Sequence, residues 1–326
     1  MDRSASLIYN PAAGAYNVES TLPDILARLQ EYGWQVDLCR TYHRGDIARL
    51  TQAAMQQERQ VVLVAGGDGS LNEAANVLAH SQTTLGVLPT GTGNVFARQL
   101  GMPIPSPWKL GKLVNAAQAL AEGQVQTIDL GRTAGRYFVL WSGTGLDAEI
   151  SASIEPKRPV IRRAGLVGYA AQVIKAALRY HGAPMTIEVD GETIHTHALL
   201  AVATNGPLYG VYFRIAPKAI LDDGYLDLII LNGENLFSKI ARVFYLLLRR
   251  VESDPQAILR RARCIQVTTP TPIPVHVDGE PLTRTPVTIE VVPQSLRILA
   301  PRQAPATLFT ALTADSSAAG DHRKAN

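Results

Sequence analysis

Cysteine is scarce in this chain, whose 326 residues include only Cys39 and Cys264. The two lie far apart and outside any Cys-x-x-Cys spacing, which argues against a disulfide framework and against a structural zinc site. The start of the chain lacks the pattern of a signal peptide, because the strand-like run Leu7–Tyr9 begins almost at once. We therefore expect a protein of a reducing, cytoplasmic environment.

Long apolar runs are also missing from the sequence. The longest stretches, such as Val243–Leu248, fall well short of the ~20 residues that a membrane-spanning helix requires. Any membrane contact is therefore expected to be peripheral. The net charge of +3 argues neither for nor against an anionic partner. Hydrophobic residues make up 46% of a chain long enough for two domains, so disorder of the whole chain is not expected.

Short apolar runs alternate with helical patterns over the first 125 residues. Four runs are typical of strands: Ser6–Tyr9, Trp34–Leu38, Val61–Ala65 and Leu85–Leu88. Apolar residues at helical spacing lie between them, and Asp46 is a candidate cap for the second helix. This alternation predicts a doubly wound, mostly parallel sheet with helices on both faces. Ligands of such sheets bind beyond the carboxyl ends of the strands.

The later part of the chain has a different pattern of predicted elements, with many strand-like runs and few long helices. The candidate strands are Gln126–Leu130, Tyr137–Trp141, Met185–Val189, His195–Ala203, Tyr225–Leu231, Ile265–Thr268, Val275–Val277 and Val287–Val292. We predict an α/β domain over residues 1–127 and a β-rich domain over 128–293. Residues 294–302 are a candidate for a strand that returns to the first domain, and 303–326 are expected to be a disordered tail.

Two glycine-rich loops follow neighbouring predicted strands. Gly66-Gly67-Asp68-Gly69-Ser70 follows the third, and Pro89-Thr90-Gly91-Thr92-Gly93-Asn94 follows the fourth. Glycines let backbone N–H groups approach polyphosphate, and a helix beginning near Leu71 adds the positive end of its dipole. Asp68 is then a candidate magnesium or phosphoryl-transfer residue. A strand-to-helix turn needs glycine in any case, so the glycines alone fit a purely structural role equally well, and Asp68 and the second loop favour the functional one.

Common nucleotide-binding motifs are absent from the sequence. Neither G-x-x-x-x-G-K-[ST] nor a complete G-x-G-x-x-G occurs, which argues against P-loop and dinucleotide-binding folds. Phosphate charge would have to be met by magnesium, backbone amides and basic side chains. Arg44, Arg98 and Lys218 are candidates for that last role.

The ordered series of motifs resembles the soluble diacylglycerol kinase catalytic-domain family, which includes bacterial lipid kinases and is related to sphingosine and ceramide kinases. The resemblance rests first on residues 66–73 and 88–97 and extends to further motifs along nearly the whole chain: Asn10–Gly14, Ile128–Gly131, Gly143–Ala148, Asp222–Asp227 and Val277–Glu280. It implies a two-domain fold of the NAD-kinase and diacylglycerol-kinase type, with an ATP cleft between a nucleotide-binding α/β domain and a β-rich lipid-binding domain.

The resemblance also implies roles for individual residues. ATP would contact the positions Asn10, Thr41, Gly66, Gly67, Asp68, Gly69, Ser70, Leu71, Asn72 and Thr92, with Asp68 serving Mg²⁺-ATP. Glu280 would be the catalytic base. Asp223 and the backbone carbonyls of Ile220 and Tyr225 would form a separate structural Mg²⁺ site. Without the resemblance, Asp222-Asp223-Gly224 is simply a turn.

Asp278 is a further catalytic candidate, two residues before Glu280. Residues at this spacing share one face of a strand, so Asp278 could orient the base. The alternative is that Asp-Gly-Glu forms an ordinary hairpin turn.

The chain departs from the family pattern at two positions. Ser70 replaces the usual threonine and keeps the hydroxyl, whereas Val95 stands where the family often has aspartate. The second change puts an acid network around magnesium in doubt. Asp129 could contribute to that network or serve as a hinge acid.

Two basic stretches with apolar residues are candidates for contact with an anionic membrane, over 157–179 and over 237–263. The alternative is that each is the solvated face of a packed helix. The arginine clusters lack the interleaved aromatic residues of single-strand nucleic-acid binders, so no nucleic-acid partner is expected. A homodimer is compatible with the sequence.

The sequence therefore predicts a peripheral lipid kinase that transfers the γ-phosphoryl group of ATP to a lipid hydroxyl. Diacylglycerol is the first choice of acceptor, and its product is phosphatidic acid. Sphingoid bases and other glycerolipids are alternatives. An NAD kinase shares the Gly-Gly-Asp-Gly loop, and a catalytically silent lipid-binding regulator is made conceivable by Val95.

Overall fold

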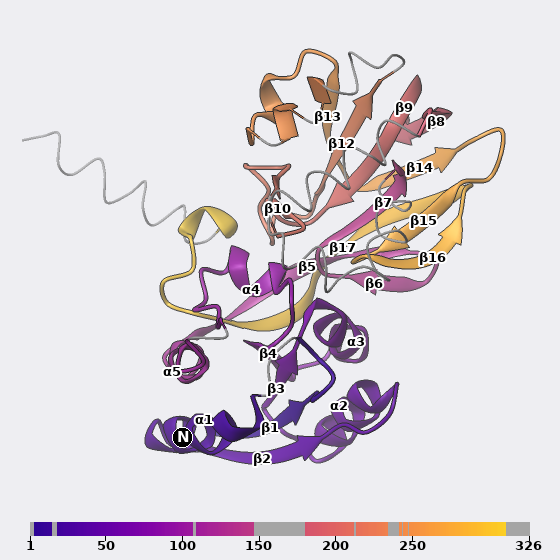
Figure 1. Ribbon diagram of the computed structural model, residues 1–326. Coiled ribbons are helices and arrows are strands. Elements are labelled where there is room, and N and C mark those ends of the chain that lie inside the picture. The colour runs from indigo at the N-terminus through magenta and orange to yellow at the C-terminus, as the bar shows by residue number, and fades with distance from the viewer. Residues whose placement is uncertain are drawn as a thin grey trace, which may run out of the picture. The chain divides into compact units, whose positions relative to one another are not determined.

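The computed structural model describes residues 3–14, 18–106, 109–146, 180–211, 213–233, 241–242, 244–246 and 248–310 (Figure 1). The chain divides into two compact units. Unit 1 comprises Met1–Leu130, Leu221–Asp223 and Pro293–Asn326, and unit 2 comprises Gly131–Ile220 and Gly224–Val292.

The sheet of unit 1 is parallel, as predicted. Its first four strands are hydrogen-bonded in the order β2-β1-β3-β4. They are β1 (Arg3–Tyr9), β2 (Trp34–Arg40), β3 (Val61–Gly66) and β4 (Thr84–Pro89). Every residue of β3 and β4 is buried, which is typical of parallel strands covered on both faces.

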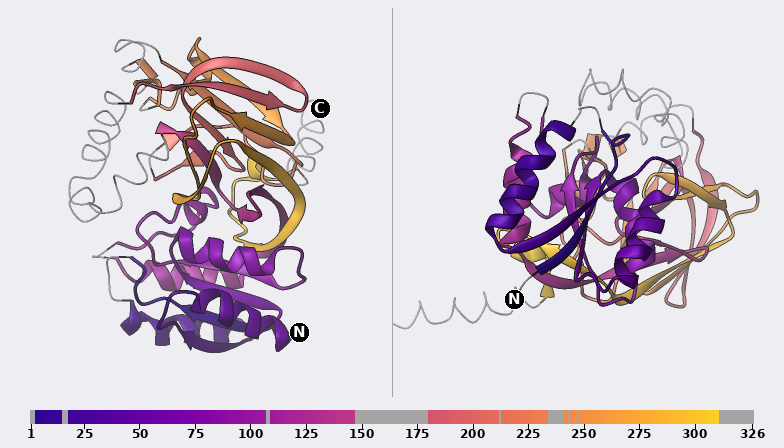
Figure 2. Two further views of the ribbon diagram at one scale, coloured as in Figure 1. Left: turned by 90° about the vertical axis from the view of Figure 1, so that its right-hand side faces the viewer. Right: turned by 90° about the horizontal axis from the view of Figure 1, so that it is seen from below.

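Helices cover both faces of this sheet. They are α1 (Leu22–Glu31), α2 (Asp46–Gln56), α3 (Asp68–Leu78), α4 (Val95–Gln99) and α5 (Lys112–Ala121), with the short 3-10 helix η1 (Glu19–Thr21) before α1. Helix α1 packs on α5 and α2 packs on α3, and Figure 2 shows the helices of unit 1 from two further sides. Leu22, Ile25, Leu26 and Leu29 recur at helical spacing in the sequence, and all but the partly exposed Leu26 are buried on α1.

The end of the described chain returns to unit 1. In β17 (Val287–Ala300), Ile298 pairs in parallel with Leu85 of β4. The 3-10 helix η4 (Ala306–Leu308) follows, and Leu308 and Phe309 are buried in the core, 2% and 0% exposed. The prediction of a disordered tail from residue 303 is therefore wrong as far as residue 310. Residues 311–326 lie outside the described residues.

Unit 2 is β-rich, as predicted, and its described pairings are antiparallel. Its main path of strands runs β16-β15-β7-β9-β8-β14-β17, with β12 between β9 and β13. The long strand β5 (Gln124–Thr133) passes from unit 1 into unit 2. The other strands are β6 (Arg136–Phe138), β7 (Trp141–Gly145), β8 (Ala183–Val189), β9 (Glu192–Thr204), β10 (Leu208–Tyr209), β11 (Phe213–Arg214), β12 (Leu226–Asn232), β13 (Ala257–Ala262), β14 (Cys264–Thr268), β15 (Pro274–Val277) and β16 (Glu280–Arg284), and η3 (Val251–Ser253) is a 3-10 helix.

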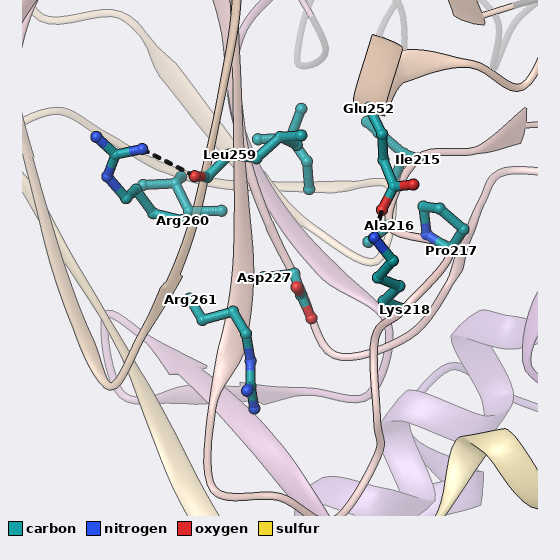
Figure 3. Close-up of a pocket in the computed structure, with 11 residues that line it drawn as sticks. Ile215, Ala216, Pro217, Lys218, Asp227, Glu252, Leu259, Arg260 and Arg261 are labelled. Carbon is teal, nitrogen blue, oxygen red and sulfur yellow. Dashed lines mark hydrogen bonds and ion pairs between the residues drawn. The ribbon is translucent and has the colours of Figure 1, made fainter.

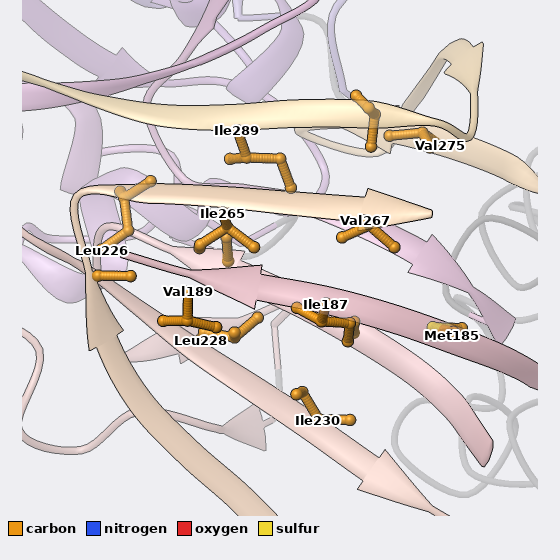
Figure 4. Close-up of a cluster of buried hydrophobic side chains, with 14 of the residues drawn as sticks. Met185, Ile187, Val189, Leu226, Leu228, Ile230, Ile265, Val267, Val275 and Ile289 are labelled. Atoms are coloured by element: carbon orange, nitrogen blue, oxygen red, sulfur yellow. The ribbon is translucent and has the colours of Figure 1, made fainter. Parts of the chain in front are cut away.

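The core of unit 2 lies between its strands (Figure 4). It is formed by alternate residues, such as Met185, Ile187 and Val189 of β8, which have polar or partly exposed neighbours. Ile265 and Ile289, paired across β14 and β17, belong to the same cluster. This alternation is the expected pattern of an antiparallel strand with one buried face.

The strand predictions for this part of the chain need correction, and the short strands β10 and β11 were among those missed. The predicted strand Tyr137–Trp141 is broken into β6 and β7. Strand β16 was not predicted. Nor was β13, which falls in the second basic stretch, so that Arg260 and Arg261 lie on a strand that pairs with β12. The first basic stretch, 157–179, lies outside the described residues. Among the described residues there is no helix with both the length and the apolar character needed to span a membrane.

Candidate active site

Loops that follow three neighbouring strands of unit 1 are joined by hydrogen bonds. The carbonyl oxygen of Gly66, at the end of β3, accepts the N–H groups of Thr90 (3.1 Å) and Gly91 (3.2 Å) after β4. After β1, the N–H of Asn10 donates to Ala65 O (3.0 Å), and its side-chain amide donates to Ser70 Oγ (3.0 Å). The two glycine loops and Asn10 therefore lie together at the carboxyl edge of the sheet, as predicted.

Glycine is required where these loops touch. A Cβ on Gly91 would lie 2.3 Å from the Cα of Gly67. Gly14 has a φ of +82°, and a Cβ there would lie 1.9 Å from Thr90 O. The glycines thus allow the loops to pack against one another. At the surface of this cluster, Gly69 and Thr92 are exposed.

Asp68, the first residue of α3, connects the two loops. Its Oδ1 accepts the N–H of Phe96 at 3.1 Å, in the first turn of α4. Burial raises the pKa of Asp68 above its ordinary value, while the N–H groups of Val95 and Phe96 and the charge of Arg98 act in the opposite direction. Asp68 therefore holds the second loop in place, in addition to any role toward magnesium.

Two buried polar atoms of the second loop have no hydrogen-bond partner among the described residues. They are Thr90 Oγ1 and Asn94 Oδ1, on residues that are 1% and 3% exposed. Leaving such atoms unpaired is unfavourable, so they indicate a partner that the chain itself does not supply. A phosphate group with its hydrated metal fits this chemistry, because the hydroxyl can donate to phosphate and the amide oxygen can accept from water.

The remaining predicted ATP contacts in unit 1 are less accessible. Leu71 and Asn72 are each 1% exposed, and Asn72 accepts hydrogen bonds from Asn76. Thr41 is 6% exposed, and its N–H donates to Tyr9 O at 3.0 Å. The side chain of Leu71 belongs to the core of unit 1.

Asp46 has a different role from the predicted one. Gly45 is the N-cap of α2, and Asp46 is its first residue. The carboxylate accepts the N–H groups of Tyr42 (2.8 Å) and His43 (2.9 Å), so it holds the loop that precedes the helix. These bonds and the nearby Arg49 lower the pKa of Asp46 to about 2.

The sequence interpretation missed Glu73, although it is part of the first glycine motif. Its Oε1 accepts the N–H of Ala48 at 3.1 Å, in the first turn of α2. Glu73 therefore ties α3 to α2 behind the loops. As the sixth residue of the helix α3, it gave no signal of this partner.

In unit 2, Asp278 and Glu280 do not share a strand face. Asp278 and Gly279, both with positive φ, form the two-residue turn between β15 and β16, which is the alternative interpretation. The Asp278 carboxylate accepts three backbone N–H groups, from Val139 (3.0 Å), Leu140 (3.0 Å) and Trp141 (2.9 Å). It therefore fixes the segment between β6 and β7.

Glu280, the predicted base, begins β16 and is partly exposed, with 46% of its side chain accessible. Its Oε2 accepts a hydrogen bond of 2.6 Å from Arg136 Nη2 of β6. Sequence reasoning missed Arg136, because residues 144 positions apart give no joint signal. The ion pair restricts the orientation of the carboxylate.

The predicted structural Mg²⁺ ligands, Ile220, Asp223 and Tyr225, are neighbours in sequence and partly exposed, and Asp223 is assigned to unit 1 and the other two to unit 2. Gly224, with a φ of +76°, bends this turn. Carboxylate and carbonyl oxygens are suitable magnesium ligands, so the donor set fits the prediction. In the described part of the chain, no three His, Cys, Asp or Glu side chains cluster as a metal site.

Asp129 is fully buried, and its Oδ1 accepts the N–H of Gln294 at 2.7 Å. This contact gives it a structural role within unit 1. Val95, where the family often has aspartate, is 3% exposed and part of the core.

The three basic candidates for phosphate differ in their surroundings. Arg98 Nε donates to the carbonyl of Gly93 (2.8 Å), within the second loop. Arg44 is exposed. Lys218 belongs to unit 2 and pairs with Glu252 at 3.3 Å beside a hollow of about 180 Å³ (Figure 3). Arg98 is thus in direct contact with the second glycine loop.

Comparison with known proteins agrees with this arrangement. Residues 4–133 match the diacylglycerol kinase catalytic domain, and residues 142–300 match the YegS C-terminal NAD kinase beta sandwich-like domain. A diacylglycerol kinase of Staphylococcus aureus (strain bovine RF122 / ET3-1) is 30% identical over 283 residues, covering 86% of this chain and 87% of the relative. The chain belongs to the diacylglycerol kinase family.

Further family members support the same assignment. A diacylglycerol kinase of Staphylococcus carnosus (strain TM300) is 27% identical, covering 93% of this chain and 96% of its own. A crystal structure of a diacylglycerol kinase from Bacillus anthracis str. Sterne shares the fold, with a TM-score of 0.73 at 22% identity over 93% of this chain and 98% of that one. The family resemblance inferred from the motifs is confirmed, and the chain is a lipid kinase.

Proposed function

We propose that this family member transfers the γ-phosphoryl group of ATP to the hydroxyl of diacylglycerol and releases phosphatidic acid and ADP. The observation that carries the proposal is the joining of the two glycine loops, in which Gly66 O binds the N–H groups of Thr90 and Gly91. This junction lies at the edge of a parallel sheet, where phosphate-binding sites form, and it holds the buried Thr90 hydroxyl, which has no partner among the described residues.

Magnesium, when bound, would neutralise phosphate charge, and Asp68 is the residue proposed to serve it. Asp223 and the carbonyls of Ile220 and Tyr225 are proposed to hold a second, structural ion. Asn10 and Ser70, which bond to each other, support the first loop. The two glycine loops and the Thr90 hydroxyl are proposed to orient the triphosphate for in-line transfer.

Glu280 is proposed to accept the proton of the lipid hydroxyl. As the bond from the acceptor oxygen to the γ-phosphorus forms, the bond from that phosphorus to the β,γ-bridging oxygen breaks, and the hydroxyl proton moves to the carboxylate. Arg136, through its 2.6 Å hydrogen bond, keeps the carboxylate in one orientation. Replacing the Glu280 carboxylate would therefore remove the base and leave the nucleotide loops in place.

The experiment that tests the reaction incubates the purified full chain with γ-labelled ATP, Mg²⁺ and mixed micelles of single lipids. Labelled phosphatidic acid is the expected product from diacylglycerol. A phosphorylated sphingoid base or other glycerolipid would replace the proposed acceptor. NADP formed from NAD would support an NAD kinase, and no labelled product would support a silent lipid-binding regulator.

The Glu280→Gln variant tests the base. We expect kcat to fall by a factor of about 100 or more, with ATP binding retained. Glu290→Gln is the matched control, because Glu290 also lies in unit 2 and pairs with an arginine, Arg132, at 2.7 Å. Equal activity of Glu280→Gln and Glu290→Gln would remove the proposed role of Glu280.

We also propose that the protein associates peripherally with an anionic membrane through Phe244, Leu248, Arg249 and Arg250. Phe244 and Leu248 are 58% and 49% exposed, and the Leu248 N–H donates to Phe244 O (2.9 Å), so the two side chains are one helical turn apart. Arg249 and Arg250 beside them are exposed. Arg242 is only 6% exposed and pairs with Asp254, so it is unsuited to contact lipid.

A further inference from the structure

A second hollow lies in unit 1, at the amino-terminal edge of the parallel sheet. Its volume is about 800 Å³, within the range of sites that hold small molecules. It is lined by Arg3, Trp34, Val61 and Thr84, the first residues of β1, β2, β3 and β4. The glycine loops follow the opposite ends of these strands, so the hollow is a separate place, about 20 Å away along a strand of six residues.

Three guanidinium groups line this hollow, those of Arg3, Arg59 and Arg297. Glu58 is the one carboxylate among the lining residues. Asp37, which is not a lining residue, pairs with Arg59. The balance of charge at the hollow is therefore positive.

Some of this positive charge has a structural explanation. Arg3 Nη1 donates to the carbonyl of Ala121, the last residue of α5, at 2.8 Å, and its guanidinium lies 5.4 Å from the Trp34 ring centroid. A cation at a helix C-terminus offsets the negative end of the helix dipole. Arg297 Nη1 donates to Gln82 Oε1 at 2.6 Å. Each guanidinium has five N–H donors, so these bonds leave donors available.

Two buried donors on residues that line this hollow have no acceptor among the described residues. One is Nε1 of Trp34, a residue only 3% exposed, and the other is Nε of Arg59. Helix capping does not account for either of them. An unpaired buried donor costs free energy, and two in one hollow indicate an acceptor that comes from outside the chain.

We propose that this hollow binds a phosphate-bearing anion, held by the guanidinium groups of Arg59 and Arg297 and by the indole N–H of Trp34. Arginine is suited to this role, because its planar fork can donate two parallel hydrogen bonds to phosphate. The anion can be a free phosphate ester or the headgroup of a phospholipid, since both present the same oxygens.

The test titrates the full chain with inorganic phosphate and measures heat and tryptophan emission. We expect saturable binding and a change in emission that is lost in Trp34→Phe. Arg59→Gln and Arg297→Gln should each weaken binding by a factor of about ten, because each removes charge-assisted hydrogen bonds. Arg59→Lys keeps the charge but not the fork, and intermediate binding is expected.

Arg28→Gln is the matched control. Arg28 also lies in unit 1, pairs with Glu31 at 3.1 Å and with Gln118 at 3.0 Å, and does not line the hollow. Its phosphate affinity should stay within a factor of two of the unchanged chain. Thermal unfolding of each variant establishes that it is folded before its binding is compared.

Sedimentation with vesicles of phosphatidylcholine, with and without phosphatidic acid, distinguishes a phospholipid headgroup from a free phosphate ester as the bound anion. If Arg59→Gln and Arg297→Gln weaken only the sedimentation with phosphatidic acid, the ligand is a lipid headgroup. If they weaken only the binding of soluble phosphate, it is a free phosphate ester. If neither variant changes either measurement, or Trp34 emission is unaffected throughout, the proposal is wrong. Kinase activity is not a readout, so the result is independent of the proposed reaction.

Discussion

At the scale of single residues, Asp46 illustrates how one carboxylate organises a predicted site. It accepts the N–H groups of Tyr42 and His43, next to the buried Thr41. Because its pKa is lowered to about 2, its stabilising contribution is complete above the ordinary value near 3.8 and is lost as the pH falls through about 2.

We therefore expect Asp46→Asn to lower the unfolding temperature at neutral pH by an amount that does not change down to about pH 4. Between pH 4 and pH 2 the difference from the unchanged chain should shrink, because Asp46 itself becomes protonated. Thermal unfolding monitored by circular dichroism across this range measures the effect. A difference that is the same at pH 6 and pH 2 would contradict the assigned bonds.

The sequence identified most of the important acids in this chain but not their partners. Asp278 and Glu280 were both selected from one short motif. The partners of Asp278 are the N–H groups of residues 139–141, more than 130 positions earlier. The partner of Glu280 is Arg136. Motif spacing reports local geometry, whereas these contacts depend on the pairing of distant strands.

At the scale of elements, the contact between the two glycine loops sets their geometry. A Cβ on Gly91 would lie 2.3 Å from Gly67 Cα, so Gly91→Ala must move one loop away from the other. We expect this variant to lose about 1–3 kcal/mol of unfolding free energy and to bind ATP more weakly. Chemical denaturation and nucleotide titration measure the two effects.

Gly111→Ala is the control for this change. Gly111 precedes α5, and a Cβ there would have no neighbour within 4 Å among the described residues. Its stability should change by less than about 1 kcal/mol, and its ATP affinity should stay the same. Equal ATP affinity of Gly91→Ala and the unchanged chain would show that the loop contact does not shape the nucleotide site.

Elements with regular apolar patterns were predictable, and those defined by distant contacts were not. The four parallel strands and α1 follow directly from the spacing and the length of the apolar runs in the sequence. Strand β13 was missed because Arg260 and Arg261 interrupt its apolar run. Its antiparallel pairing with β12, which the sequence does not reveal, makes it a strand. The break between β6 and β7 is produced by Asp278, which binds the N–H groups there.

The exposed pair Phe244 and Leu248 provides a test of membrane contact. We expect the double change Phe244→Ser and Leu248→Ser to weaken sedimentation with anionic vesicles by a factor of about ten or more, because apolar side chains lose their contact with lipid. Leu38→Ser is the matched control, since Leu38 of unit 1 is 45% exposed and lies outside this segment. Equal loss in both variants would indicate a nonspecific effect. Binding should also fall with added salt, as Arg249 and Arg250 are screened.

At the scale of the whole molecule, unit 1 is assembled from three separated stretches of chain. Its parallel strands come from the beginning, whereas β17 and the buried residues Leu308 and Phe309 come from the end. The alternating pattern at the start predicted the sheet. The contribution of Phe309 could not be predicted, because one aromatic residue in an Ala- and Thr-rich segment shows no periodicity.

Phe309 tests whether the end of the described chain is part of the core of unit 1. Its side chain is fully buried, so Phe309→Ala should lower the unfolding free energy by about 3–5 kcal/mol, through lost contacts and the cavity left behind. Phe244→Ala is the matched control, because Phe244 is 58% exposed and its removal should cost less than about 0.5 kcal/mol. Urea denaturation followed by circular dichroism measures both. Similar stabilities of the two variants would show that residues 303–310 do not stabilise the sheet, and the early interpretation of this segment as disordered would then be restored.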